Sequence, residues 1–213
     1  GQNTPSIKVN AVRDRGAKVV LHGDNYDEAS QHAKTLCQAQ GLVYIHPYDD
    51  VDVIAGQGTI GMEIVNQHSE PLDAIFVPVG GGGLVAGVAA YVKYLRPKTK
   101  IIGVEAQGSN CLDAAMRAGR RVRLPIDQLD LFADGVSVAQ IGKETFKVAK
   151  KYVDDVVVVN VDEICAAIKD VFEDTRCVAE PAGALAIAGM KGSVDAHPGM
   201  SHVVSIVSGA NVN

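Results

Sequence analysis

The chain has few cysteines, and none is spaced as zinc or redox motifs require. The four cysteines are Cys37, Cys111, Cys165 and Cys177, and no two are separated by two residues. This spacing argues against zinc ribbons and thioredoxin-type motifs. Cys165 and Cys177 lie in apolar helical patterns, so we expect both to be small buried hydrophobes. With no disulfide framework and no signal-peptide pattern, we expect a reducing compartment, either the cytoplasm or an organelle stroma or matrix.

The sequence also lacks an excess of positive charge and an uninterrupted membrane span. Its 20 Lys and Arg against 25 Asp and Glu give a net charge of −5, whereas sequence-independent nucleic-acid binding needs clustered cations. We interpret the four arginines within residues 117–123 as a solvated loop. Residues 74–92 carry no charge, but they contain Pro78 and five glycines, which favour a strand, a loop and a helix over a span. We expect neither a nucleic-acid nor a membrane partner.

Short Val- and Ile-rich runs alternate with longer helical patterns. The expected strands are 18–21, 43–46, 73–79, 100–105, 155–160 and 202–207. The expected helices are 26–39, 51–67, 84–94, 111–118, 143–152, 161–175 and 181–190. This alternation predicts an α/β fold with three layers and a mainly parallel twisted sheet, whose ligands lie at the carboxyl ends of the strands. A break near residues 46–50 divides the chain into expected domains 1–48 and 49–213.

Four consecutive glycines form the most informative motif of the sequence. Gly80, Gly81, Gly82 and Gly83, called the glycine loop below, lie between an expected strand and a helix that starts at Leu84. Backbone N–H groups at a helix N-terminus suit a phosphate, and a side chain there would block its approach. A tight turn needs only one or two glycines, so we interpret this loop as a phosphate site. A second loop, residues 208–211, follows the last expected strand at the same edge of the sheet.

One interpretation of the glycine loop is a dinucleotide-binding Rossmann domain. Gly81, Gly83 and Ala86 fit the pattern G-x-G-x-x-G/A, and Glu105 ends the next strand, where an acidic residue would bind ribose hydroxyls. Three features weigh against it. Two strand–helix units precede the loop, and four glycines exceed what a dinucleotide turn needs. The second loop, moreover, would have no role in binding a dinucleotide. This interpretation stays open as an alternative, as does a non-catalytic fragment that serves as a structural or binding module.

The other interpretation comes from a resemblance that covers the whole chain. The segment VPVGGGGL at 77–84 resembles the phosphate loop of the fold-type-II pyridoxal-phosphate enzymes of the serine/threonine dehydratase family. Five further segments are similar to motifs of that family, in order: TPSIKV at 4–9, IAGQGT at 54–59, FADGV at 132–136, EPAGA at 180–184 and SGANVN at 208–213. The segments GKETF at 142–146 and CAAIKD at 165–170 resemble its biosynthetic threonine dehydratase branch. The resemblance implies a tryptophan-synthase-β-like fold and pyridoxal 5'-phosphate as cofactor.

The resemblance also implies roles for single residues. The cofactor phosphate would bind at the glycine loop and Leu84. The hydroxyl of Ser208 would bond to the pyridine nitrogen, and Asn211 would belong to the same second binding loop. A hydroxyl partner leaves that nitrogen unprotonated, which favours β-elimination. Gly135 would lie near the ring of the cofactor. Glu180 resembles a carboxylate near the active-site cleft, although it is equally well placed as a first-turn charge of a helix.

A metal site is a weak expectation. In the serine racemase branch, a carboxylate at the place of Glu105 binds a divalent cation, and the accompanying positions here would be Ser109 and Cys111. Sulfur is a poor ligand for such a hard cation. We therefore expect no metal, with Glu105 as the only weak candidate.

The implied activity is β-elimination of L-threonine, a small amino acid, to 2-oxobutanoate and ammonia, the first step of isoleucine biosynthesis. Serine dehydratase or serine racemase activity is the alternative within the same chemistry. The family's Ser-x-Lys-x-Arg-Gly-Ala-like motif, whose lysine forms the Schiff base with the cofactor, and its Ser-x-Gly-Asn loop are absent from these 213 residues. We therefore expect no catalytic residue and no turnover by this chain alone. Residues 1–48 resemble part of a small domain with an exposed sheet edge, which would favour pairing into a homo-oligomer.

Overall fold

The computed structural model describes residues 1–211, which fall into two compact units. The first contains Gly1–His46 and Asn211, and the second is Pro47–Ala210. The domain boundary that we expected after residue 48 lies two residues from this division. That residues 1–48 form part of a small domain stays a prediction.

The first unit contains two helices and no strand among its described residues. Helix α1 is Ser6–Arg13, which the sequence pattern does not predict, and α2 is Tyr26–Gln40. Asn25 caps α2 by accepting from the N–H of Glu28, and Gly41 ends it with a φ of 64°. The strands expected at 18–21 and 43–46 are wrong. Both runs lack a ladder partner among residues 1–211, and without one the β-propensity of exposed Val43 and Ile45 cannot form a strand.

The second unit is built on a four-stranded parallel sheet. Its strands are β1 (Ala74–Pro78), β2 (Lys100–Ala106), β3 (Asp155–Val159) and β4 (Val203–Ser205), in the order β3-β2-β1-β4. Every pair is parallel, with Phe76 opposite Ile102 on one side and Ser205 on the other. The four expected strands of this unit and their parallel pairing are confirmed.

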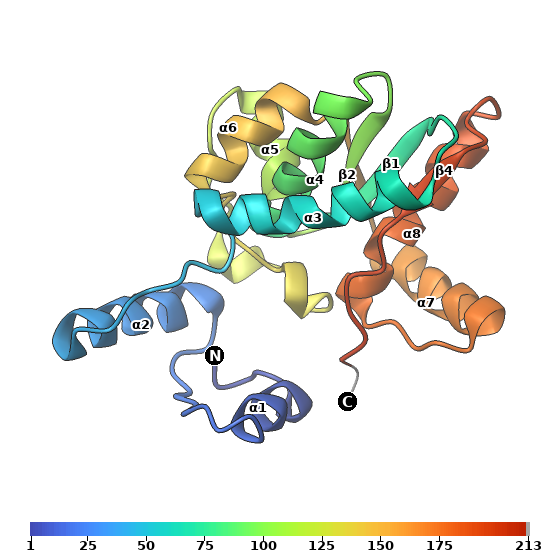
Figure 1. The fold of residues 1–213 in the computed structure, drawn as a ribbon. Helices are drawn as coiled ribbons and strands as arrows, with labels where there is room; N and C mark the ends of the chain where they lie inside the picture. The colour runs from blue at the N-terminus through green and yellow to red at the C-terminus, as the bar shows by residue number, and fades with distance from the viewer. Residues whose placement is uncertain (212–213) are drawn as a thin grey trace. The chain divides into compact units, whose positions relative to one another are not determined.

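Helices cover both faces of this sheet (Figure 1). One face carries α4 (Gly83–Leu95), α5 (Cys111–Ala118) and α6 (Lys143–Tyr152), with α3 (Val51–Gln67) packed on α4. The other carries α7 (Val161–Thr175) and α8 (Pro181–Ala196). Short 3-10 turns at Ile126–Gln128 and Asp134–Val136 lie in the long connection before α6. The three-layer α/β prediction is confirmed.

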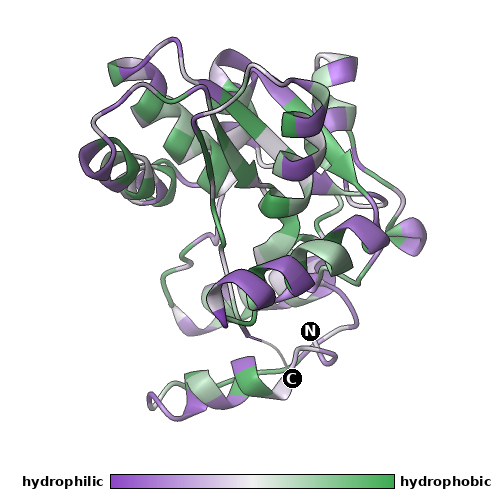
Figure 2. Cartoon of the chain, turned by 90° about the vertical axis from the view of Figure 1, so that its right-hand side faces the viewer, coloured by the Kyte–Doolittle hydropathy of each residue, from purple (hydrophilic) through white to green (hydrophobic). Residues whose placement is uncertain are grey.

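The strands alternate their side chains between the two layers, as a pleated sheet requires. Along β1, Ile75 and Val77 join the core under α4 and α6, whereas Ala74 and Phe76 join the core under α8. All four are fully buried. Figure 2 shows these strands as a hydrophobic interior, with the hydrophilic residues gathered on the helices around them.

Two further expectations concern the burial of two cysteines and the absence of a membrane span. Cys165 and Cys177 are exposed, so their predicted burial is wrong. The core face of α7 is formed by Ile164 and Ala167, and Cys177 lies in the connection that follows the helix. Among the described residues, no helix has the length and apolar composition needed to cross a membrane.

Helices α3 and α4 approach each other through glycines. A Cβ placed on Gly87 of α4 would lie 2.6 Å from the backbone nitrogen of Gly58 and would also overlap the carbonyl oxygen of Ile54 on α3. Backbone atoms cannot give way as a flexible side chain would, so this crossing holds only when residue 87 is glycine.

We predict that Gly87→Ala lowers the free energy of unfolding by about 1–3 kcal/mol, because it forces the helices apart. Gly56→Ala is the matched control, since its Cβ would meet nothing within 4 Å on the same α3. That substitution should raise stability by up to about 1 kcal/mol through helix propensity. Urea unfolding of both variants measures the difference, and equal effects would contradict the close-packing argument.

Candidate functional site: a glycine loop at the carboxyl edge of the sheet

The glycine loop joins the end of β1 to the start of α4. Gly82 is the N-cap of α4 and has a φ of 90°, a left-handed conformation that side chains disfavour. Gly81, Gly82 and Gly83 are all buried. A Cβ on Gly82 would lie 2.5 Å from Cδ1 of Ile141, and one on Gly81 would overlap the ring of Tyr48. The loop therefore needs glycine for its turn and for its close neighbours.

The carbonyl groups of the loop are held from the side of α5 and α6. The oxygen of Gly81 accepts from the N–H of Gly142 at 3.2 Å and from Oγ1 of Thr145 at 2.9 Å. The oxygen of Gly80 accepts from Sγ of Cys111 at 3.5 Å. Burial and the nearby Glu105 carboxylate raise the pKa of the Cys111 thiol, which therefore keeps the proton that it donates.

The N–H groups of the loop, in contrast, have no acceptor in the protein. Within residues 1–211, no carbonyl or side chain accepts from the N–H of Gly81, Gly82 or Gly83. Buried N–H groups need a partner, and those at the start of a 13-residue helix favour an anion. The N-terminus of neighbouring α6 is already served by Asp49, whose carboxylate accepts from the N–H groups of Lys143, Glu144 and Thr145.

The structure brings the second loop and two other predicted residues together. The oxygen of Gly209 accepts from the N–H of Glu180 at 3.1 Å, and a Cβ on Gly209 would overlap the Glu180 carboxylate. A Cβ on Gly135 would lie 3.7 Å from Oε1 of Glu180. Ser208 is exposed, and its hydroxyl makes a long 3.4 Å bond to the oxygen of Ala182. Gly135, Glu180 and Ser208 thus form one cluster.

This cluster also connects to the glycine loop. A Cβ on Gly80 would lie 3.0 Å from Cα of Val136, the residue after Gly135. Glu180 is the N-cap of α8 and makes no side-chain cap bond. Its role as a carboxylate of the site stays a prediction. Asn211 belongs to the first unit, so its place relative to the loop is not described. The last two residues of its motif, 212–213, lie outside the described part of the chain.

Glu105 has a structural role that differs from the ribose-binding and metal-binding roles considered from the sequence. Its side chain is fully buried, and its two carboxylate oxygens accept from the N–H groups of Leu112 and Asp113 at 2.8 Å each. Glu105 therefore caps α5, whose own N-cap residue Asn110 makes no side-chain cap bond. The described residues contain no group of three or more His, Cys, Asp or Glu side chains that could hold a metal ion.

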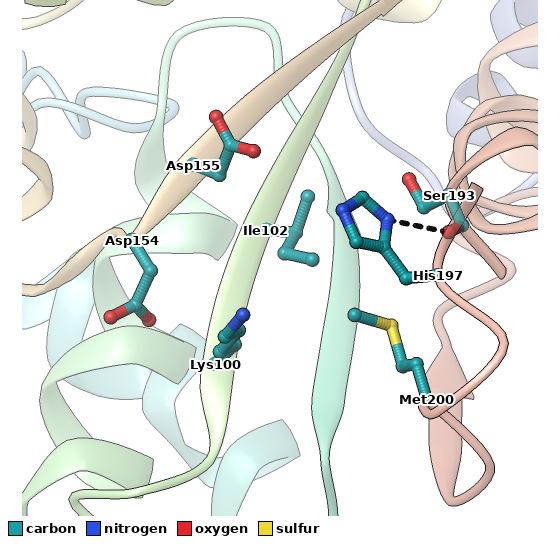
Figure 3. Close-up of a pocket in the computed structure, with 7 residues that line it drawn as sticks. All are labelled: Lys100, Ile102, Asp154, Asp155, Ser193, His197 and Met200. Carbon is teal, nitrogen blue, oxygen red and sulfur yellow. Dashed lines mark hydrogen bonds between the residues drawn. The ribbon is translucent and has the colours of Figure 1, made fainter.

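A surface pocket lies at the opposite, amino edge of the sheet. Figure 3 shows Lys100 and Ile102 on β2, with His197 and Met200, which follow α8, facing them. Nδ1 of His197 is bonded to the oxygen of Ser193 at 2.9 Å. Ligands of parallel α/β sheets bind at the carboxyl edge, so this pocket is not a part of the candidate site.

The comparisons with known proteins agree with the geometry of the loop. Residues 1–209 match the family described as pyridoxal-phosphate dependent enzyme. The chain belongs to this family. Its cofactor is pyridoxal 5'-phosphate, which carries the phosphate monoester that bare N–H groups suit.

Curated proteins with sequences similar to this chain are named threonine dehydratases. The chain is 53% identical over 213 residues to the L-threonine dehydratase biosynthetic IlvA of Pasteurella multocida, and 53% identical over 212 residues to the chloroplastic biosynthetic threonine dehydratase of Arabidopsis thaliana. It covers 41% and 35% of these proteins. The chain thus spans about two fifths of the length of the curated relatives that it matches.

Solved structures of the family show the same fold. The processed threonine deaminase isoform 2 of Solanum lycopersicum superposes with a TM-score of 0.93 at 46% identity, covering all of this chain and 61% of that one. The serine racemase of Dictyostelium discoideum gives 0.86 at 33% identity, covering all of this chain and 67% of that one. The fold-type-II prediction is therefore confirmed.

Sequence reasoning missed the residues that support the loop from outside. Tyr48 and Asp49 lie in the segment that we read only as a domain break, and Thr145 lies in a segment that we used only as a family motif. Their signal was weak, because Asp49 caps a helix that starts 94 residues later. The capping side chains that local patterns do reveal lie close in sequence, as Asn160 and Glu163 do at the start of α7.

Glu105 gives this site a testable pH dependence. Burial raises the pKa of Glu105 from 4.5 to about 8, in spite of the two N–H bonds that lower it. The folded protein thus binds a proton that the unfolded chain has released between these values, so this group's contribution to stability falls as pH rises from about 4.5 to 8. We predict that Glu105→Gln flattens this decline, by at most about 1.4 kcal/mol per pH unit.

The measurement is urea unfolding of both proteins from pH 5 to pH 9. The exposed Glu70→Gln serves as control and should leave the profile unchanged. Parallel profiles of wild type and Glu105→Gln would contradict the role of Glu105.

Proposed function

We propose that this chain is the cofactor-binding part of a threonine dehydratase, which converts L-threonine to 2-oxobutanoate and ammonia by β-elimination. The observation that carries the proposal is the set of N–H groups of Gly81, Gly82 and Gly83, which are buried at the start of α4 without an acceptor in the described residues. The threonine dehydratase names of relatives at 53% identity support the substrate. The biosynthetic names support a place at the start of isoleucine synthesis.

The proposed roles follow the two loops. The N–H groups of the glycine loop and of Leu84 hold the phosphate, assisted by the dipole of α4. The hydroxyl of Ser208 donates to the pyridine nitrogen, since it is exposed and only weakly bonded at 3.4 Å. Gly135 and Glu180 line the space beside Ser208. We include Asn211 in the second cofactor-binding loop on the strength of its sequence motif. When bound, the cofactor supplies an electron sink for the α-carbon of the substrate.

The structure argues against the dinucleotide alternative, because the carboxylate expected to bind the ribose hydroxyls is not accessible. A Rossmann site needs a carboxylate that reaches ribose hydroxyls at the end of the second strand. Glu105 stands at that place, but it is fully buried, and its oxygens are bonded to the N–H groups of Leu112 and Asp113. Serine as substrate is the closer alternative, since the serine racemase of Dictyostelium discoideum has the same fold at 33% identity.

Assembly and compartment are further parts of the proposal. Val43 and Ile45 expose 84% and 73% of their surface, which supports burial of this apolar run against another chain in a homo-oligomer. The names of two relatives place them in the chloroplast and in the mitochondrion, which supports a stroma or matrix, with the cytoplasm as the bacterial counterpart. Sedimentation tests the assembly, and a monodisperse monomer would count against it.

We predict that the purified chain binds pyridoxal 5'-phosphate and not NADH. Binding of the former changes the visible absorbance spectrum of the cofactor, and pyridoxal without its phosphate should bind at least about tenfold more weakly, since it makes no charge-assisted bonds to the loop. NADH fluorescence serves as the control for the dinucleotide alternative. Enhanced NADH fluorescence without a spectral change of pyridoxal phosphate would contradict the proposal.

We also predict that the pure 213-residue chain does not turn over L-threonine, because none of its segments matches the family's full Ser-x-Lys-x-Arg-Gly-Ala motif. Formation of 2-oxobutanoate is followed with L-threonine and, as the comparison substrate, L-serine. Turnover by this chain alone would show that one of its own lysines serves the reaction.

A further inference from the structure

We propose that Thr145 is a positioning residue for the cofactor phosphate. Its hydroxyl holds the carbonyl group of Gly81, and this fixes the direction in which the N–H of Gly82 points. The inference rests on the proposed function, because it takes the glycine loop as the phosphate site.

The peptide between Gly81 and Gly82 carries the argument. Oγ1 of Thr145 donates to the Gly81 oxygen at 2.9 Å, and the side chain of Thr145 is completely buried. In a trans peptide the N–H points opposite to the C=O of the same unit, and the described chain contains no cis peptide. Since the Gly81 oxygen points toward Thr145 and Gly142, the N–H of Gly82 must point away from α6.

Thr145 is the third residue of α6, and the residue four positions earlier, Ile141, lies before the N-cap Gly142. Thr145 therefore has no helix carbonyl at the position that a threonine inside a helix normally bonds to. Its hydroxyl bonds to the glycine loop instead.

The position of Thr145 itself is fixed from two sides. Asp49 accepts from the N–H of Thr145 at 3.3 Å and from those of Lys143 and Glu144 at 2.8 and 2.7 Å, which fastens the first turn of α6. A Cβ on Gly82 would lie 3.1 Å from Cβ of Thr145. The threonine therefore packs directly against the turn whose N–H it orients, and a small rotation of that peptide would break the bond.

The test compares two substitutions in the 213-residue chain labelled with ¹⁵N. Thr145→Val keeps the shape and removes the hydroxyl, whereas Thr145→Ser keeps the hydroxyl. Affinities for inorganic phosphate and for pyridoxal 5'-phosphate are obtained from the amide signals of Gly81, Gly82 and Gly83. Pyridoxal, which lacks the phosphate, is the control ligand, and thermal unfolding monitors the fold.

We expect Thr145→Val to weaken both phosphate ligands by about five- to tenfold, the value of one lost hydrogen bond. Pyridoxal binding should be unchanged, and Thr145→Ser should stay within about twofold of wild type. The Gly82 amide signal should shift more on Thr145→Val than those of its neighbours. Thr145→Ala also removes the hydroxyl, so it should weaken phosphate binding by a similar factor, and it decides the question if Thr145→Val does not fold.

Two results would overturn the inference and leave the proposed function standing. One is phosphate binding at wild-type strength in Thr145→Val. The other is an equal loss in Thr145→Ser and Thr145→Val, which would show that packing of the methyl group matters and the hydroxyl does not. If the wild-type chain binds neither phosphate ligand, the proposed site fails and the inference fails with it.

Discussion

The turn from β1 into α4 is the constraint on which the rest of the second unit depends. The backbone must reverse in a buried place, with Gly82 in a left-handed conformation and no side chain at Gly81. Three parts of the chain pack closely against this turn: the ring of Tyr48 before α3, Ile141 before α6, and Val136 in the long connection. A residue larger than glycine at any of these contacts would move an element that the sheet and its helices hold in place.

The placement of capping side chains then distinguishes the helix N-termini at this edge of the sheet. Helix α5 has the carboxylate of Glu105 at its start, and α6 has that of Asp49. Both carboxylates come from outside the helices that they cap, which also ties distant parts of the chain together. In α4, by contrast, the loop N–H groups have no acceptor within the described residues. An external anion therefore has a well-prepared place at the start of α4, and it lies at the edge where parallel α/β sheets bind their ligands.

The sequence was most informative where local pattern and tertiary environment agree. The four strands of the sheet are rich in apolar residues, with β1 and β2 largely buried, and their parallel order follows from the helices between them. The glycine loop was also visible, because four glycines in a row have few structural explanations. The runs 18–21 and 43–46 have the same β-propensity, yet they are not strands, since pairing depends on a neighbour that propensity does not specify.

The supports of the site were not predictable for a related reason. Asp49 and Thr145 act on backbone groups far away in sequence, and Glu105 carries no local sign that it caps the helix starting at Cys111. Its acidic character instead suggested ribose or metal binding. Burial decides between such tasks, and burial of one carboxylate is a property of the whole fold.

A crystal structure of the chain with pyridoxal 5'-phosphate tests the central claim most directly. The account predicts phosphate oxygens within about 2.7–3.2 Å of the backbone nitrogens of Gly81, Gly82 and Gly83. It also predicts that the Gly81 oxygen stays bonded to Thr145. A phosphate bound at another helix N-terminus, or at the amino edge of the sheet near His197, would contradict it.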